Sequence, residues 1–115
     1  ESGIFVFPAT GVWSITFSSS AKQVSKRGFV NMSLQTTVNN STYGTSGEGL
    51  QGIASSNSDP SYANFWIDHI FDVTSVSTHK CKFRLDVAYP SDSVIFVGSG
   101  TVSYTYMTFI RFGDT

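Results

Sequence analysis

His69 and His79 are the histidines of the sequence, and a hydrolase would need one of them as a base beside a nucleophile. Serine is abundant, but no Gly-x-Ser-x-Gly elbow is present to expose one as a nucleophile. His69 alternates in phase with Phe65 and Ile67, which predicts a histidine of the core or of an interface, with a catalytic base as the less favoured alternative. His79 falls in the polar segment 75–80, where we expect it to be solvated.

Asp68 and Asp72 would have to form a close pair for glycosidase chemistry, which uses carboxylates about 5–10 Å apart. Four residues of a β-strand span about 13 Å, so this pair fits poorly. The sequence contains no His-Glu-x-x-His, P-loop or EF-hand pattern. We therefore assign no catalytic residue, no cofactor and no metal ligand, and we expect a protein that is not an enzyme. A structural calcium ion is left open.

Three tyrosines, Tyr43, Tyr62 and Tyr89, fall at expected loop tips among Asn, Asp and Ser residues. An aromatic ring surrounded by polar groups is the usual chemistry of a sugar site. Turn composition accounts for the same residues without any ligand. The three tyrosines are therefore candidates for surface binding, together with the segment 39–61.

The composition indicates one globular domain over residues 1–115. Aromatic residues make up 15% of the chain and charged residues 13%, which argues against disorder and against a coiled coil. The formal net charge of −1 provides no field that would attract nucleic acid. No apolar run approaches the roughly 20 residues of a membrane span, so we expect no membrane insertion. The single cysteine, Cys81, is in phase with Phe83 and Leu85 and is predicted to be a small buried hydrophobe.

Strand patterns recur along the whole chain, and no helical period persists beyond about ten residues. Pro8 and Gly11 force a turn between the first two strands. The segment 39–61 is predicted to be a loop, interrupted at most by short pairing around residues 50–54. Short links and one long loop predict an all-β, antiparallel two-sheet sandwich, with a jelly roll favoured over an immunoglobulin-like fold. The expected strands are 3–7, 11–19, 28–38, 62–73, 80–88, 93–97 and 102–112.

The last expected strand, 102–112, is apolar on both faces. Met107 and Phe109 lie on one side, and bulky side chains also occupy the other. A strand of this kind must be covered twice, and a chain this small offers only one covering sheet. A second copy of the chain is the favoured cover, with extra loop cover or plain local hydrophobicity as alternatives. The residues expected at the contact are Trp13, Tyr104, Tyr106, Ile110 and Phe112.

Two segments carry a resemblance to a known family. The run Gly-Ile-Phe-Val-Phe-Pro-Ala-Thr-Gly-Val-Trp-Ser-Ile-Thr-Phe at 3–17 resembles a segment of the complement globular head and tumour-necrosis-factor jelly-roll family. The ending Tyr-Met-Thr-Phe-Ile-Arg-Phe-Gly-Asp-Thr at 106–115 is similar to the last strand of such domains, above all in phage and marine-virus structural proteins. The family carries strands before its Gly-x-Phe segment, so the first strands are expected upstream of residue 1. The resemblance implies a homotrimer with the last strand near the threefold axis, at the tip of a stalk.

The combined expectation is a non-enzymatic virion protein: a trimeric head domain of a phage tail or capsid fibre or appendage. Its partners would be itself, other virion proteins and possible host-surface glycans or receptors. Linked weak sites gain about 10²–10⁴ in avidity, which suits a trimer. One alternative is a secreted complement-like or cytokine-like ligand that binds a protein receptor. Another is a monomeric carbohydrate-binding module.

Overall fold

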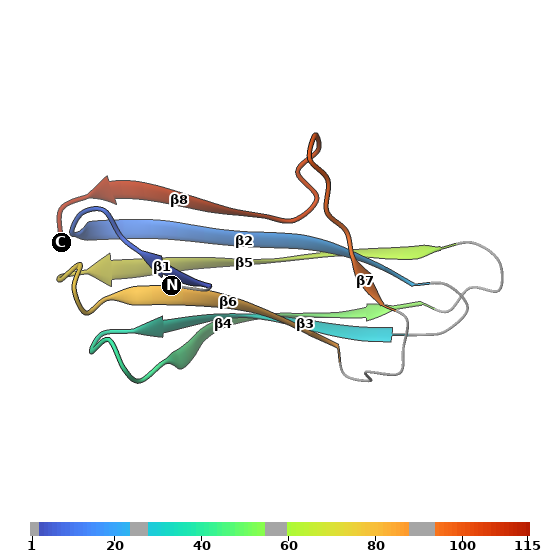
Figure 1. Cartoon of the computed structure of the whole chain (residues 1–115), viewed down its shortest axis with the longest axis horizontal. Coiled ribbons are helices and arrows are strands. Elements are labelled where there is room, and N and C mark those ends of the chain that lie inside the picture. Colours follow the sequence, from blue (N-terminus) through green and yellow to red (C-terminus); the bar gives the residue numbers. More distant parts are fainter. Residues whose placement is uncertain (1–2, 24–27, 55–59, 88–93) are drawn as a thin grey trace.

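The chain folds into two antiparallel β-sheets packed face to face, which confirms the predicted all-β sandwich (Figure 1). The structure is a computed structural model that describes residues 3–23, 28–54, 60–87 and 94–115. Its strands are β1 Ile4–Val6, β2 Gly11–Gln23, β3 Gly28–Thr37, β4 Gly44–Ile53, β5 Ser61–Val73, β6 Lys80–Val87, β7 Ile95–Phe96 and β8 Tyr106–Gly113.

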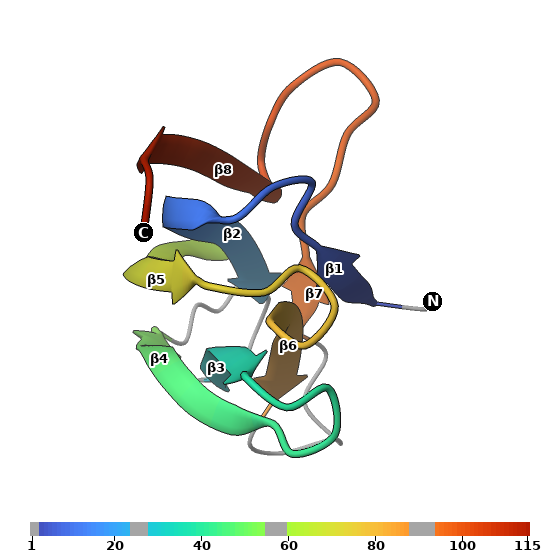
Figure 2. The ribbon, with the colours of Figure 1, turned by 90° about the vertical axis from the view of Figure 1, so that its left-hand side faces the viewer.

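The first sheet has the strand order β1-β6-β3-β4. In the second sheet, β2 is the central strand: β5 pairs with it along one side, and β8 and β7 pair with successive parts of its other side. The end-on view in Figure 2 shows the two layers, with β4 of the first sheet beside β5 of the second.

The core lies between the inner faces of β2 and β3. Every second residue of β2 from Gly11 to Gln23 is buried, because alternate side chains of a strand point to the same face. The opposing residues Met32 and Leu34 of β3 are fully buried. Burying a side chain of this size stabilises the fold by about 1.5–3 kcal/mol.

The two sheets approach closely at the edge formed by β4 and β5. A β-carbon on Gly47 would lie 2.6 Å from Ile67 Cγ2, and one on Gly49 would lie 3.2 Å from the backbone oxygen of Trp66. Only glycine leaves room for this approach. The prediction of a loop over 39–61 was therefore wrong for the ten residues of β4, whose glycines lower β-propensity but permit close packing.

At the opposite edge, phenylalanine rings from β1, β6 and β8 close the sandwich. The ring of Phe109 lies 5.4 Å from that of Phe5 and 6.1 Å from that of Phe83 between centroids. Beside these rings is an apolar hollow of about 210 Å³, lined by Phe5, Val6, Phe7, Pro8, Trp13 and Phe109. Phe109, on the inner face of the last strand, thus has its cover within the chain, whereas Met107 on the same face is 38% exposed.

Several predicted strand ends are wrong. β2 continues four residues past the expected end at 19, because its pairing with β5 extends over all thirteen residues. β8 begins at Tyr106 and not at 102, since 97–105 forms a loop whose turn is held by the Ser99 hydroxyl. β7 contains two residues.

Candidate functional site

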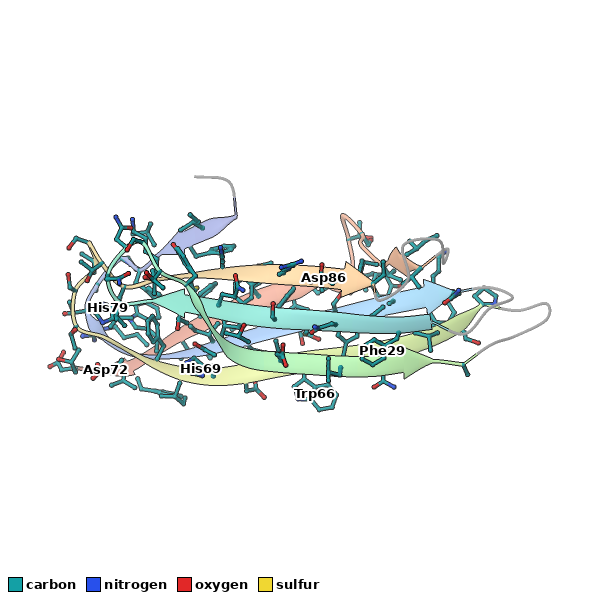
Figure 3. The ribbon with its side chains drawn as sticks, turned by 90° about the horizontal axis from the view of Figure 1, so that it is seen from below. Phe29, Trp66, His69, Asp72, His79 and Asp86 are labelled. Carbon is teal, nitrogen blue, oxygen red and sulfur yellow. The ribbon has the colours of Figure 1, made fainter. Side chains whose placement is uncertain are left out.

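Both histidines have their rings beside that of Phe71. The ring centroid of His79, after the turn that follows β5, is 5.7 Å from that of Phe71. The ring centroid of His69, two residues before Phe71 on β5, is 6.2 Å from it. His79 is 9% exposed, so the expectation of a solvated side chain was wrong (Figure 3). Its ring nitrogens lie 3.3 Å from the Thr74 hydroxyl and 3.0 Å from the Thr78 hydroxyl, which give this turn residue its hydrogen bonds inside the fold.

His69 occupies the inner face of β5 and is half-buried opposite Ile15. Burial lowers the pKa of its imidazole from the ordinary value. A lowered pKa by itself does not make a catalytic base, because that role also needs a nucleophile within hydrogen-bond reach. The described residues contain no such hydrogen bond to His69.

Asp68 and Asp72 project from the outer face of β5 and are exposed. Asp68 accepts a hydrogen bond of 2.8 Å from the Thr16 hydroxyl on β2, so it serves the sheet surface. Across 3–23, 28–54, 60–87 and 94–115, no three His, Cys, Asp or Glu side chains gather as ligands for a metal ion.

The outer face of the second sheet carries a different kind of arrangement. Its central strand, β2, presents small hydroxyl residues, including Ser14, Thr16 and Ser18, which are half-buried. The flanking strands present large apolar side chains that are exposed. These are Tyr62 (63%), Trp66 (63%) and Ile70 (57%) on β5, and Tyr106 (43%), Ile110 (53%) and Phe112 (65%) on β8. Figure 3 shows Trp66 pointing away from the core.

The residues expected at a subunit contact lie in different parts of the structure: on the outer face, in a loop and in the core. Tyr106 and Ile110 lie on the outer face, across from Ser18 and Ser14, and Phe112 is exposed near the end of β8. Tyr104 lies in the loop before β8. Trp13 instead lies in the core, 8% exposed, where its ring packs on Phe7 and its indole nitrogen donates to Ala9 O.

The tyrosines predicted to bind at the surface do not lie together. Tyr43 lies beside the first sheet, with the Lys82 ammonium 4.3 Å from its ring centre. Tyr62 lies on β5 in the second sheet, opposite Lys22 of β2. Tyr89 lies outside the described residues.

A groove joins Tyr62 to two of the residues expected at the subunit contact. It has a volume of about 690 Å³ and lies over the Gln23 half of β2, between β5 and the 97–106 segment that rises above the sheet in Figure 1. Its lining residues are Ser18, Ser20, Lys22, Tyr62, Asn64, Val97, Ser103, Tyr104 and Tyr106. We call this the tyrosine groove.

Thr105 fixes the wall that carries Tyr104 and Tyr106. Its hydroxyl donates to Val97 O at 2.7 Å and lies 2.9 Å from the Ser19 hydroxyl. Val97 in turn donates its backbone N–H to Ser20 O at 2.8 Å. These bonds attach both ends of the loop to β2, and they hold the two tyrosines in place over it.

Sequence reasoning missed part of this face. The exposed apolar residues Trp66 and Ile70 of β5 were not among the residues predicted at the contact. Lys22, Ser20 and Asn64 gave no signal of their own, because they meet the tyrosines only through strand pairing.

No protein-family model matches the chain, and no curated protein matches its sequence. Within the described residues, the structure has no helix with the length and apolar character needed to cross a membrane.

Proposed function

We propose that the chain is a jelly-roll head domain of a trimeric virion protein, a phage tail or capsid fibre or appendage. It acts in assembly and in attachment to the host surface, without catalysis. The observation that carries the proposal is the exposed apolar outer face of the second sheet, where Ile70, Ile110 and Phe112 are each more than half exposed. Apolar side chains gathered on one face indicate an interaction surface.

The order of the strands supports the jelly roll. β3 and β4 are neighbours in the first sheet, and β7 and β8 both pair with β2 in the second. Every other pair of consecutive strands is divided between the two sheets. Exchange of successive strands between two sheets is what a jelly roll requires. The two segments that resemble the complement and tumour-necrosis-factor family form β1 with β2, and β8.

The amount of exposed surface supports association of copies. A monomeric globular protein of 12.5 kDa exposes about 6,200 Å². This chain exposes 6749 Å², and its radius of gyration is 16.0 Å where about 13 Å is usual. A thin, extended sandwich gains from a cover on its apolar face. A net charge of −1 leaves little repulsion between identical copies. The number three comes from the family resemblance.

The test is the mass in solution, measured by light scattering at micromolar concentration. We expect about three times 12.5 kDa for the wild-type chain. Ile110→Glu should give the monomer mass with an unchanged β circular dichroism spectrum, because it places a charge in the contact. Leu50→Glu is the matched control, since Leu50 is equally exposed (56%) on β4 of the other sheet. A monomeric wild-type chain, or dissociation by Leu50→Glu alone, would contradict the proposal.

The virion role has its own test. The genes beside the one for this chain should encode tail or capsid proteins.

The rival function, a secreted complement-like or cytokine-like ligand, predicts N-glycosylation. The sequence has three sequons, at Asn31, Asn39 and Asn40. Asn39 and Asn40 are exposed, while Asn31 has a buried side-chain oxygen within the paired strand β3. Glycan occupancy at Asn40 in the natural source would favour the secreted ligand.

A further inference from the structure

We propose that the tyrosine groove is a saccharide-binding site with a preference for glycans that carry a carboxylate. This rests on the attachment part of the proposed function and gives that attachment a place and a ligand chemistry. The groove lies over the Gln23 half of β2, whereas Ile70, Ile110 and Phe112 lie toward the Gly11 half. This assigns Tyr104 and Tyr106, which the sequence predicted at the subunit contact, to ligand binding instead, so assembly and ligand binding use different ends of one face.

The shape of the groove suits a small ligand. Its volume of about 690 Å³ falls in the range of about 300–1,000 Å³ that is typical of such sites. Tyr62 on β5 and Tyr106 on β8 stand on the two strands that flank β2. Those strands are about 10 Å apart, since neighbouring strands are separated by about 4.8 Å. Because Tyr62 pairs with Lys22 and Tyr106 with Ser18, the two tyrosines are also offset by about 13 Å along β2, so a saccharide of two or more rings can lie along the groove with a tyrosine near each end.

The polar side chains of the lining favour a saccharide over an apolar ligand. The floor consists of Ser18 and Ser20 with Asn64 beside them, all of which need hydrogen-bond partners when water is displaced. Ser20 donates to the Asn64 carbonyl oxygen at 2.6 Å. The Asn64 side chain is exposed, and its amide group carries two N–H donors that can bond to a ligand hydroxyl. Sugar hydroxyls can pair with this floor while the C–H face of the ring packs on tyrosine.

The charge of the groove lining indicates which class of saccharide would bind. Lys22 is the charged residue among those that line the groove, and the lining contains no carboxylate. A glycan with a carboxylate group therefore gains an ion pair with Lys22 and meets no opposing charge. A single cation is too little for nucleic acid, which proteins bind through several phosphate contacts.

The groove is organised before any ligand arrives. Thr105 turns its hydroxyl toward Val97 and Ser19, so its two neighbours in sequence, Tyr104 and Tyr106, both line the groove. A wall that is already fixed lowers the cost of ordering side chains on binding.

The experiment uses the full chain with an N-terminal biotin, displayed on tetravalent streptavidin so that avidity does not depend on trimer formation. The probe is a printed array of neutral, N-acetylated and carboxylate-bearing glycans. We expect binding to saccharides of the carboxylate-bearing class, reduced about tenfold or more by Tyr62→Ala and by Tyr104→Ala. Lys22→Met should remove the preference for acidic glycans and retain binding to neutral ones. Tyr43→Ala is the matched control, because Tyr43 lies beside the other sheet, and it should bind as wild type.

Each outcome decides one point. Absence of binding to every printed glycan overturns the inference, and so does binding that Tyr43→Ala weakens as much as Tyr62→Ala does. Dissociation of the trimer by Tyr62→Ala also overturns it, because the groove would then be a contact between copies. If wild-type chain is monomeric by light scattering yet binds glycans through the groove, the assembly proposal falls and the saccharide site stands.

Discussion

Gly47 on β4 lies against Ile67 on β5, so closely that a β-carbon at residue 47 would stand 2.6 Å from Ile67 Cγ2. The contact joins the edges of the two sheets, where the branched side chain of Ile67 is buried and has little room to move. A longer residue at 47 would force the edges apart.

We predict that Gly47→Ala lowers the free energy of unfolding by about 1–3 kcal/mol, through overpacking at this edge. Gly52→Ala is the control within the same strand, because no atom lies within 4 Å of its added β-carbon. It should be neutral or stabilise by up to about 1 kcal/mol. Urea unfolding followed by circular dichroism measures both. Equal effects of the two substitutions would show that the sheets are not in close contact here.

Phe109 and Phe112 lie three residues apart on β8 and should behave in opposite ways. Phe109 packs among the rings of Phe5, Phe7 and Phe83, so Phe109→Ala should cost about 3 kcal/mol of stability. Phe112 is 65% exposed, so Phe112→Ala should leave the stability of the monomer within about 0.5 kcal/mol and weaken assembly instead. Thermal unfolding and light scattering separate the two effects. A large loss of stability at 112 would contradict the assignment of the faces.

Cys81 should be inert in the folded protein. Its side chain is fully buried on β6, and burial raises the pKa of the thiol to about 12. The thiolate is the reactive form, so iodoacetamide at about pH 8 should label the folded chain very slowly and the urea-unfolded chain at once. The labelling is measured by mass spectrometry. Rapid labelling without denaturant would mean that β6 opens or that the thiol is accessible.

His69 should make stability depend on pH on the acid side. Burial lowers its pKa below the ordinary 6.5, so the unfolded chain binds a proton more readily than the folded chain does. The free energy of unfolding should therefore fall as the pH decreases below about 6.5, down to the pKa of the folded state. His69→Gln should flatten this dependence. Melting temperatures between about pH 7.5 and 5.5 provide the comparison, and identical slopes in both proteins would refute the assignment to His69.

Strand alternation was sufficient to predict the sandwich and most of its core. The buried residues of β2 and β5 follow a period of two. In β3, Val30, Met32 and Leu34 follow it, but Ser33 and Thr37 are buried out of phase, next to the bulge between Leu34 and Gln35. Cys81 was predicted correctly by the same argument, since its neighbours in phase are apolar. β4 could not be predicted, because glycine has a low strand propensity. Its glycines Gly47 and Gly49 are explained by the short distance to β5 of the other sheet, which the sequence alone does not show.

The tyrosine groove could be predicted only in part. Tyr62, Tyr104 and Tyr106 were each identified from sequence, but in two separate roles. They line one groove because Tyr62 pairs with Lys22 on one side of β2, and Tyr106 pairs with Ser18 on the other side. Such pairing depends on the register of strands that are distant in sequence, and local patterns do not contain it. The burial of His79 was missed for the same reason, because Phe71 of β5 covers it.

The position of β8 beside β2 also affects how the chain reaches its folded state. The Arg111 guanidinium donates to Thr10 O at 2.9 Å, so groups about a hundred residues apart form neighbouring parts of one sheet. During synthesis on the ribosome, both edges of β2 can be paired only after β8 has emerged. Topologies of this kind fold in milliseconds to seconds, and chaperones would meet an unpaired edge of β2 during that interval.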